Sequence, residues 1–312
     1  MLISTKSTVY RLPSAATTSD PELLVDNIEV RRVAEGEDLD FIALGNGNLI
    51  ILNGQEKRTV PSGIEDRIDS LLIFNEDPIN LLIGCTPPNL YRLLEGEGSA
   101  IMNDNFDELE VRNKWFTPWG GPPAVRSMAK TVDGWVYADI HVGSIMRSKD
   151  EGETWEPVEP ELHRDVHEVN TSKSDPEMVY ANTYNSVFVS YDRGDSWKHR
   201  NGVLDSRYGR GIAVHPTDPE VILCGVSDGP HGDNVHGQLY WTDNAGEKWE
   251  HVKEGFPDST KKNIDTFHIA FYGENKSWVT DENTLYLSED KGRTFETFWE
   301  APEEILMISV KQ

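Results

Sequence analysis

The order of apolar and polar residues along the chain predicts short β-strands joined by tight turns. In the clearest stretch, four short runs rich in apolar residues, 124–131, 135–140, 144–148 and 154–158, follow one another with few residues between them. The first two are separated by Asp133-Gly134, a pair that favours a turn because glycine accepts a positive φ. Runs of this length bounded by turn residues are typical of strands. The stretch therefore predicts a four-stranded unit, whose strands we name A to D.

The same unit recurs before and after this stretch. After it, strands A to D are expected at 166–171, 178–182, 187–190 and 196–199, then at 211–215, 221–226, 238–241 and 248–252, then at 266–272, 277–280, 284–287 and 294–299. Before it, they are expected at 30–33, 41–44, 48–52 and 57–60, then at 68–74, 80–85 and 89–94 with a longer final region at 99–115. Self-similarity at a period of 20–50 residues marks a repeat architecture.

A sequence motif marks the turn between strands C and D in four of these units. Its pattern is Ser/Thr-x-Asp/Asn-x-Gly-x-Thr/Ser-Trp/Phe, with Lys248 the one departure. The Asp or Asn side chain accepts hydrogen bonds from the backbone of its own turn, and the glycine supplies a positive φ. The aromatic residue then opens strand D and anchors it in a core. The copies lie 42, 52 and 46 residues apart, at 148–155, 190–197, 242–249 and 288–295.

This motif is the Asp-box, and through it the chain resembles the BNR-repeat proteins, the sialidase-like and WD40/YVTN/BNR-like β-propellers. The resemblance implies a propeller in which the box is a folding device and not a catalytic site. Sialidases of this kind have six blades and a Phe/Tyr-Arg-Ile/Leu-Pro motif, a pattern that Tyr10-Arg11-Leu12-Pro13 fits. In the repeat alignment, however, these residues fall on a C strand, beside Tyr91-Arg92 and Met146-Arg147 and away from the central channel. We therefore expect no sialidase site there.

The two ends of the chain carry the strands of one further blade. Its A strand is expected at 305–310, and its B, C and D strands at 2–5, 8–11 and 23–28. Closing a ring in this way removes the exposed sheet edges that invite aggregation. We therefore predict an all-β fold, a seven-bladed β-propeller of four-stranded blades that forms a single domain over 1–312 and is closed between the N- and C-termini. The closing blade would combine 1–28 with 303–312.

Charge and composition narrow the classes of partner. The chain has 54 Asp and Glu against 29 Lys and Arg, a formal net charge of −25, which disfavours nucleic acid and anionic membranes as partners. No run of 18 apolar residues predicts a transmembrane helix, and residues 1–8 lack an apolar signal core, so we expect a cytoplasmic protein. Cys85 and Cys224 lie in apolar runs of different repeats and are expected to be buried free thiols.

Strand parity predicts where a ligand would bind. If successive strands of a blade alternate in direction, the D–A and B–C connections share one face of the ring. The A–B and C–D turns, with all four Asp-boxes, share the other face. Because loops on a rigid scaffold commonly carry function, we expect a site at the channel mouth on the face opposite the boxes.

Histidine and arginine residues gather among the loops of this face. Six of the nine histidines fall there, namely His141, His163, His167, His231, His236 and His268, and Arg126, His167 and Arg210 align at the start of consecutive A strands. We expect Arg126, Arg210, Asp228, His231 and His268 to bind a substrate, and His141, His167, Tyr208 and Asp265 to carry the chemistry. In the structural alternative, these arginines pair with carboxylates between blades and the histidines bond to the backbone.

Three kinds of chemistry suit this set of residues. A glycosidase needs two carboxylates at one of two separations, and Asp165, Glu168, Asp228, Asp233 and Asp265 lie on this face, although a sequence gives no distances across a ring. A lyase or hydrolase would use histidine and tyrosine as base and acid. A divalent metal is the third option, held by His141, His167, His231 and His268 with one ligand from each loop, but no local His-Glu-x-x-His spacing supports it.

The sequence thus favours a glycosidase- or lyase-like enzyme acting on a small anionic or sugar-derived substrate. The Asp-boxes indicate the fold and not the reaction. The alternative is a non-catalytic binding or assembly scaffold, which predicts a broad basic or apolar patch. No stripe of Lys or Arg marks such a patch.

Overall fold

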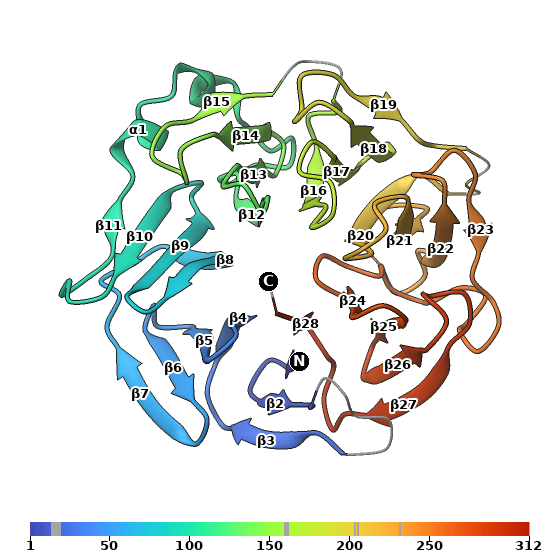
Figure 1. The fold of residues 1–312 in the computed structure, drawn as a ribbon, viewed down its shortest axis with the longest axis horizontal. Coiled ribbons are helices and arrows are strands. Elements are labelled where there is room, and N and C mark those ends of the chain that lie inside the picture. The colour runs from blue at the N-terminus through green and yellow to red at the C-terminus, as the bar shows by residue number, and fades with distance from the viewer. Residues whose placement is uncertain (14–19, 159–161, 203, 205, 231, 312) are drawn as a thin grey trace.

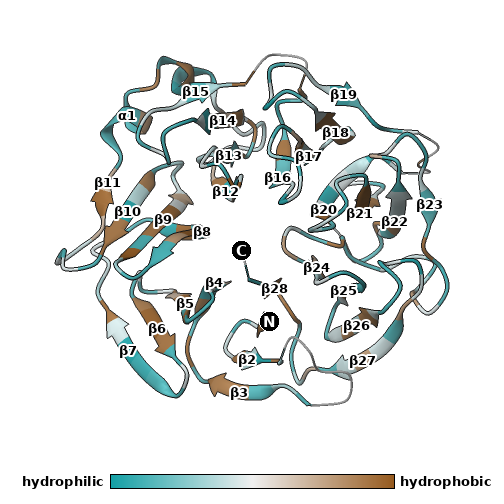
Figure 2. Ribbon diagram, in the orientation of Figure 1, coloured by the Kyte–Doolittle hydropathy of each residue, from teal (hydrophilic) through white to brown (hydrophobic). Residues whose placement is uncertain are grey.

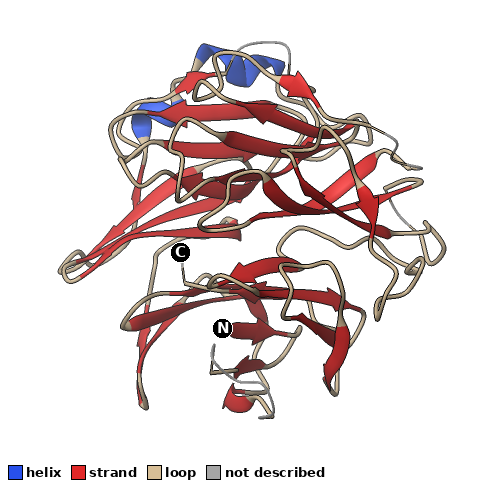
Figure 3. Cartoon of the chain, turned by 45° about the vertical axis from the view of Figure 1, so that its right-hand side comes forward, coloured by secondary structure: helices blue, strands red, loops and turns tan. Residues whose placement is uncertain are grey.

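Seven four-stranded antiparallel sheets surround a common axis in the computed structural model of the chain (Figure 1). The structure describes residues 1–13, 20–158, 162–202, 204, 206–230 and 232–311. The innermost strands of successive sheets contact one another around the ring. The predicted seven-bladed β-propeller is therefore confirmed. In the described part of the chain, helices are confined to two short segments at the outer edge (Figure 3), and none of them is long and apolar enough to cross a membrane.

Six of the seven blades are continuous in sequence, and each begins with its innermost strand. The first two of these blades contain β4 (Val30–Glu35), β5 (Leu39–Leu44), β6 (Leu49–Asn53) and β7 (Glu56–Val60), then β8 (Arg67–Glu76), β9 (Ile79–Thr86), β10 (Leu90–Leu94) and β11 (Ile101–Met102). The next two contain β12 (Val125–Lys130), β13 (Val136–Ile140), β14 (Ser144–Ser148) and β15 (Glu156–Pro157), then β16 (Val166–Thr171), β17 (Val179–Thr183), β18 (Ser186–Ser190) and β19 (Lys198–His199). The last two contain β20 (Tyr208–Val214), β21 (Val221–Ser227), β22 (Gln238–Asp243) and β23 (Glu250–His251), then β24 (Ile269–Tyr272), β25 (Lys276–Asp281), β26 (Thr284–Ser288) and β27 (Glu296–Glu300).

The closing blade combines the two ends of the chain, as predicted. Its strands run in the order β28 (Met307–Ser309), β1 (Leu2–Ser4), β2 (Val9–Arg11) and β3 (Glu22–Val25). β28 is the innermost strand and pairs antiparallel with β1, with Ile3 opposite Ile308. Arg11 lies on β2, the third strand of its blade, and pairs with Asp40 of the next blade. The rejection of 10–13 as a sialidase motif is therefore consistent with its place in the fold.

The outermost strands depart most from the predicted bounds. β15, β19 and β23 have only two residues each, because the residues before them belong to the Asp-box turns. The long region expected at 99–115 holds β11, a single helical turn α1 (Asp104–Asp107) and a 3-10 helix η1 (Glu110–Lys114). Phe106 of α1 is fully buried and packs edge-on against Trp155 of the next blade. This segment therefore covers the junction between two blades.

Apolar clusters fill the spaces between neighbouring blades. If the closing blade is counted as the first, one cluster joins Tyr180 and Val189 of the fifth blade (β16–β19) to Ile222 and Cys224 of the sixth (β20–β23). Apolar residues are concentrated on strands, whereas many connecting loops are hydrophilic (Figure 2). Cys85 and Cys224 are both free and buried, as the sequence predicts. Because each blade buries its faces against its neighbours, the packing between adjacent blades stabilises the ring.

Each Asp-box closes its turn with a repeated set of hydrogen bonds. In the second box, Asp192 accepts hydrogen bonds from the Ser190 hydroxyl (2.8 Å), the Ser196 amide (2.8 Å) and the Ser196 hydroxyl (2.6 Å). The Gly194 amide donates to Ser190 Oγ at 2.7 Å. The residue before the box glycine also has a positive φ, 61° at Arg193, which the sequence did not predict. The box carboxylate is thus occupied in holding the turn.

Three of the boxes also dock their blade onto the preceding one. The carbonyl of the residue before the box glycine accepts a hydrogen bond from the previous blade, from Arg147 to Arg193 O (2.9 Å) and from Trp241 to Lys291 O (2.8 Å). In the fourth blade, the Glu151 carbonyl accepts from Arg92. The positive φ of the box therefore presents this carbonyl to the neighbouring sheet.

Removing one box carboxylate is expected to destabilise the ring. Asp192→Ala removes the two acceptor oxygens of three hydrogen bonds and should lower the free energy of unfolding by about 1–3 kcal/mol. Asp192→Asn should cost less than about 1 kcal/mol, because the third box uses Asn244 at the same position and its Oδ1 still accepts the Lys248 amide. Urea unfolding followed by circular dichroism measures both. Equal losses from the two variants would contradict this role of the box.

Candidate functional site

A repeated β-bulge shapes the start of five innermost strands. The pairing of each with its neighbour shifts register by one residue near its first residues, at β4, β8, β12, β16 and β20. The extra residue is His167 on β16 and Asp69 on β8, and Arg126 and Arg210 lie within the shifts on β12 and β20. Because a bulge re-aims a side chain that the strand would otherwise direct to its own face, these charged groups converge at one end of the ring.

Arg126 and His141 are in direct contact at this end. Arg126 Nη2 lies 2.9 Å from His141 Nδ1 and 3.1 Å from its Nε2. His141 follows β13 directly, and its backbone amide donates to Ala124 O at 2.9 Å, which holds it next to the start of β12. The D–A connection and the B–C loop of this blade therefore meet, as strand parity predicted.

Asp165 lies between the two histidines. Its Oδ1 is 3.5 Å from His141 Nε2 and 3.2 Å from His167 Nε2. His167 is fully buried, and its Nδ1 donates to the Gly209 carbonyl at 2.5 Å. In the neutral imidazole this leaves Nε2 as the acceptor, and the Tyr208 hydroxyl donates to it at 3.2 Å. The bond to Gly209 thus fixes the tautomer of His167.

Gly209 is required for this contact. A Cβ at Gly209 would lie 1.7 Å from Asn182 Oδ1, so no side chain fits there. The close approach of β20 to β17 brings the Gly209 carbonyl within reach of the His167 ring. Glycine is thus part of the site through its backbone.

Arg210 completes the cationic part of the cluster. Its Nη1 donates to Asp265 Oδ1 at 3.1 Å, its Nη2 donates to Pro230 O at 3.1 Å, and its guanidinium lies 5.3 Å from the centre of the Tyr208 ring. Among the described residues, buried Arg126 Nη1 and Arg210 Nε have no hydrogen-bond partner. Buried donors of this kind are costly when unpaired, so they indicate a site for an anion.

Exposed aromatic side chains flank the polar cluster. Trp119 is 61% exposed and its ring centre lies 5.1 Å from that of His141, while Tyr184 is 54% exposed and packs edge-on against Tyr208 at 5.6 Å. Tyr184 also stacks on His163 at 5.4 Å. Large exposed aromatics beside a polar cluster are typical of a ligand-binding surface.

Burial sets the charge of the two histidines. Burial, followed by the charges of Arg126 and His167, lowers the pKa of His141 to about 3. Burial lowers the pKa of His167 to about 4, although Asp165 acts to raise it. Burial also raises the pKa of Tyr208 above its usual value. At neutral pH the cluster therefore offers two neutral imidazoles and a neutral phenol beside two guanidinium groups.

Four carboxyl groups named above, Asp165, Asp265, Asp228 and Glu168, are poor general acids. Burial acts to raise the pKa of Asp165 and of Asp265, but the interaction with His167 in the first case and the charge of Arg210 in the second outweigh burial and lower the pKa. The pKa of Asp228 is lowered by hydrogen bonds from Ser206 and His236. Burial raises the pKa of Glu168, but its Oε2 accepts the amides of Ile212 and Phe267 inside the ring. None of these four groups is an exposed, protonated acid.

His141, Asp165 and His167 have the spacing of metal ligands. Ligands at bonds of about 2.0–2.2 Å around a tetrahedral cation lie roughly 3.3–3.5 Å apart. The Asp165–His distances of 3.2 and 3.5 Å are within about 0.1 Å of this range, and Asp165 Oδ1 is buried without a hydrogen-bond donor among the described residues. The residues therefore fit a divalent cation by spacing. Arg126 and Arg210 oppose one electrostatically, and Arg126 occupies the edge of the His141 ring.

The structure brings together most of the residues predicted from the sequence, though not all. Arg126, His141, His167 and Tyr208 form one connected cluster, and Arg210 joins it through Tyr208 and Asp265. His268 lies apart from the possible metal ligands and donates to Leu306 O at 3.1 Å. Asp228 is held by Ser206 and His236 on an exposed loop. His231 lies outside the described residues.

Two features of the cluster were not assigned from the sequence. Asp165 was considered only as one of several carboxylates, and its place between two imidazoles depends on the bulge in β16. Arg32 of β4 was missed, although it lies at the start of an A strand like Arg126. Its pKa is lowered by burial and responds to the charges of Asp69, Arg67 and Arg126. Aligning all innermost strands, including that of the second blade, could have found Arg32.

Comparisons with known proteins support the fold. A family model described as "Sortilin, neurotensin receptor 3" matches residues 143–261, less than half of the chain. No curated protein sequence matches the chain.

Solved structures of similar fold have different functions. An ancestral GH74 enzyme has a TM-score of 0.65 and 14% identity, with 97% of this chain and 39% of the enzyme covered. The GH74 enzyme of Niastella koreensis has a TM-score of 0.69 and 13% identity, with 95% of this chain and 51% of the enzyme covered. YCF48 bound to D1 peptide has a TM-score of 0.59 and 17% identity, with 86% and 82% covered. The chain thus spans about half or less of the GH74 enzymes, and identities this low indicate the fold and not the reaction. The chain is a seven-bladed β-propeller similar to BNR-like propellers, among them both enzymes and a peptide-bound protein.

Proposed function

We propose that this protein is a lyase that binds the carboxylate of a uronic acid residue and eliminates the group at the β-carbon. The observation that carries this proposal is the pair of buried guanidinium groups with unpaired donors, Arg126 Nη1 and Arg210 Nε. A carboxylate held between them would supply the missing acceptors, and charge-assisted hydrogen bonds of this kind are about twice as strong as neutral ones.

The aromatic flank supports a sugar as the body of this ligand. Trp119 and Tyr184 are both more than half exposed, and each contacts a residue of the cluster or its neighbour. A pyranose ring has an apolar C–H face that packs on an aromatic ring and polar hydroxyls at its edge. Tyrosine and tryptophan suit such mixed surfaces, because each combines an apolar ring with a polar group.

In the proposed reaction, His141 is the base and Tyr208 the acid. His141 removes the proton from the carbon next to the carboxylate, and Arg126 and Arg210 stabilise the negative charge that develops on the carboxylate oxygens. The electron pair of the broken C–H bond forms a carbon–carbon double bond as the bond to the leaving oxygen breaks. The Tyr208 hydroxyl, which donates to His167 Nε2 in the free protein, rotates toward that oxygen and gives it its proton. The proton on His141 later returns to Tyr208 through solvent.

Asp165 and His167 are positioning residues in this scheme. Asp165 Oδ1 lies 3.5 Å from His141 Nε2 and would stabilise the imidazolium that forms on His141. His167 is fully buried and accepts the Tyr208 hydroxyl hydrogen bond, so it orients the acid without contacting the substrate. A carboxylate beside a catalytic imidazole acts in the same way in serine hydrolases.

Substrate binding would activate the base. The pKa of free His141 is low, first because of burial and then because of the charge of Arg126, with Arg210 contributing further. A bound carboxylate offsets both guanidinium charges and therefore raises the pKa of His141. The imidazole becomes a stronger base only when the anionic substrate is in place.

A lyase is preferred over a glycosidase because of the carboxyl groups. A glycosidase requires one carboxyl with a raised pKa to protonate the leaving oxygen. Asp165, Asp228 and Asp265 all have lowered pKa values, and Glu168 is enclosed by main-chain amides. The neutral phenol of Tyr208 is the better proton donor at this site.

The first test is the discrimination between a sugar acid and its neutral analogue. Wild-type protein is expected to bind D-glucuronate at least tenfold more tightly than D-glucose in isothermal titration calorimetry. Arg126→Gln removes a charge-assisted contact of about 1.5–3 kcal/mol and should weaken glucuronate binding roughly 10- to 100-fold. Arg58→Gln, on the exposed outer strand β7, is the matched control. Equal affinity for the two sugars would disprove the anion site.

The second test is the titration of the histidines by NMR. Free His141 and His167 are expected to stay neutral above about pH 5, because their pKa values are about 3 and about 4. Asp165→Asn removes a charge that raises both pKa values, so it should shift both titrations to lower pH. Saturating glucuronate should raise the pKa of His141.

Variants His141→Gln and His167→Gln assign the signals. Titration of both imidazoles near 6.5, their ordinary value, would contradict the buried cluster. Repeating the titration after EDTA treatment distinguishes a metal-bound cluster from a metal-free one, since a bound cation would keep both imidazoles unprotonated until it is removed.

A further inference from the structure

A cavity lies along the axis of the ring, toward the C-terminal ends of the innermost strands. Its volume is about 330 Å³, and it is lined by residues of six innermost strands or of the segments next to them. Lys130 ends β12, Val214 ends β20 and Val310 follows β28, whereas Arg126 and His167 lie near the starts of their strands. The cavity is therefore distinct from the cluster described above, and Glu168 lines its inner part.

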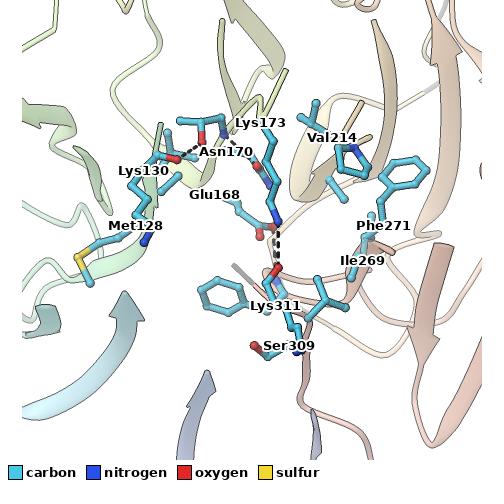
Figure 4. Close-up of a pocket in the computed structure, with 18 of the residues that line it drawn as sticks. Met128, Lys130, Glu168, Asn170, Lys173, Val214, Ile269, Phe271, Ser309 and Lys311 are labelled. Atoms are coloured by element: carbon cyan, nitrogen blue, oxygen red, sulfur yellow. Dashed lines mark hydrogen bonds between the residues drawn. The ribbon is translucent and has the colours of Figure 1, made fainter. Parts of the chain in front are cut away.

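Two lysines at this cavity have no carboxylate partner among the described residues. Lys130 Nζ donates to Ile73 O at 2.5 Å, and Lys173 Nζ donates across the cavity to Lys311 O at 3.1 Å (Figure 4). Neither ammonium group forms an ion pair in the described part of the chain, whereas Lys311 pairs with Glu37 at 2.8 Å. Burial, and then the charge of Lys173, lowers the pKa of Lys130, so the two cations repel one another.

The other polar side chains of this cavity are already hydrogen-bonded. Asn170 donates to Ile212 O at 3.3 Å and accepts from the Thr171 amide, and Thr171 Oγ1 donates to Lys130 O at 2.7 Å. Ser309 Oγ accepts from the Glu35 amide at 3.0 Å. An ammonium group has three donors, and Lys130 and Lys173 each show one bond within the described chain. The donors left for a ligand are therefore mainly cationic.

Apolar side chains form the opposite wall. Figure 4 shows Val214, Ile269 and Phe271 on one side of the cavity and Lys130 with Met128 on the other, with Lys173 between them. A compact inorganic ion would leave this wall in contact with water. A ligand with one anionic group and an apolar body would pair with the lysines and also cover the wall.

We propose that this cavity binds a small amphipathic carboxylate, with its anionic group at Lys130 and Lys173 and its apolar body against Val214, Ile269 and Phe271. The site is independent of the proposed lyase activity, because no residue of the arginine–histidine cluster lines it. In a chain of net charge −25, two unpaired lysines in a concave cavity provide local attraction for an anion.

The experiment is isothermal titration calorimetry with 3-phenylpropionate as the probe. Wild-type protein is expected to bind this acid at least tenfold more tightly than the uncharged 3-phenylpropionamide and than inorganic phosphate. Lys130→Met and Lys173→Met should each weaken binding of the acid about tenfold or more. Lys149→Met removes an exposed lysine of the first Asp-box and should leave binding unchanged.

The second lysine variant and an arginine variant complete the test. Lys173 lies in an exposed turn, so Lys173→Met keeps the test valid if Lys130→Met fails to fold. Arg126→Gln should leave binding of 3-phenylpropionate unchanged, which places the acid away from the arginine cluster. Equal affinity for acid and amide, equal affinity for phosphate, or loss of binding in Arg126→Gln would each overturn the proposal.

Discussion

One extra residue near the start of each of five innermost strands is the constraint on which the site depends. The bulges lie at the same place in β4, β8, β12, β16 and β20, and so at one end of the ring. Without the shift, the side chain of His167 would take the direction set by the regular alternation of β16, and its contacts with Asp165 and Tyr208 would be lost. The convergence of guanidinium, imidazole and phenol groups is thus a consequence of a local backbone irregularity repeated by the fold.

The Asp-boxes stabilise the ring that carries these bulges. Each box carboxylate fixes its own turn, and the neighbouring carbonyl fixes the contact with the preceding blade. The boxes lie at the opposite end of the blades from the cluster, so the turns that hold the blades together are separated along the strands from the candidate site. Unpaired donors such as Arg126 Nη1 are unfavourable in the free protein, and a rigid scaffold is needed to hold them in place.

The repeat rhythm made the fold predictable, although not every strand boundary: β20 (Tyr208–Val214) begins three residues before the predicted run and β24 (Ile269–Tyr272) three residues after it. β16 begins and ends where the apolar run does, whereas β15, β19 and β23 are shorter than their runs because the box aromatic packs into the core before the strand begins. Strand parity also predicted that His141 and Arg126 would meet. The bulges could not be predicted, because an inserted residue leaves no clear signal in a short apolar run. For this reason Asp165 was not separated from the other carboxylates. Arg32 was missed for another reason, because β4 was not aligned with the other innermost strands.

Catalysis distinguishes this account most directly from a binding or assembly scaffold. The decisive measurement is the ultraviolet absorbance of a carbon–carbon double bond during incubation of the protein with a series of polyuronates. The account predicts that absorbance rises with at least one of them, and that Tyr208→Phe abolishes the rise while uronate binding is retained. Uronate binding by the wild-type protein without any double-bond formation across the series would contradict the lyase and leave a sugar-acid-binding propeller in its place.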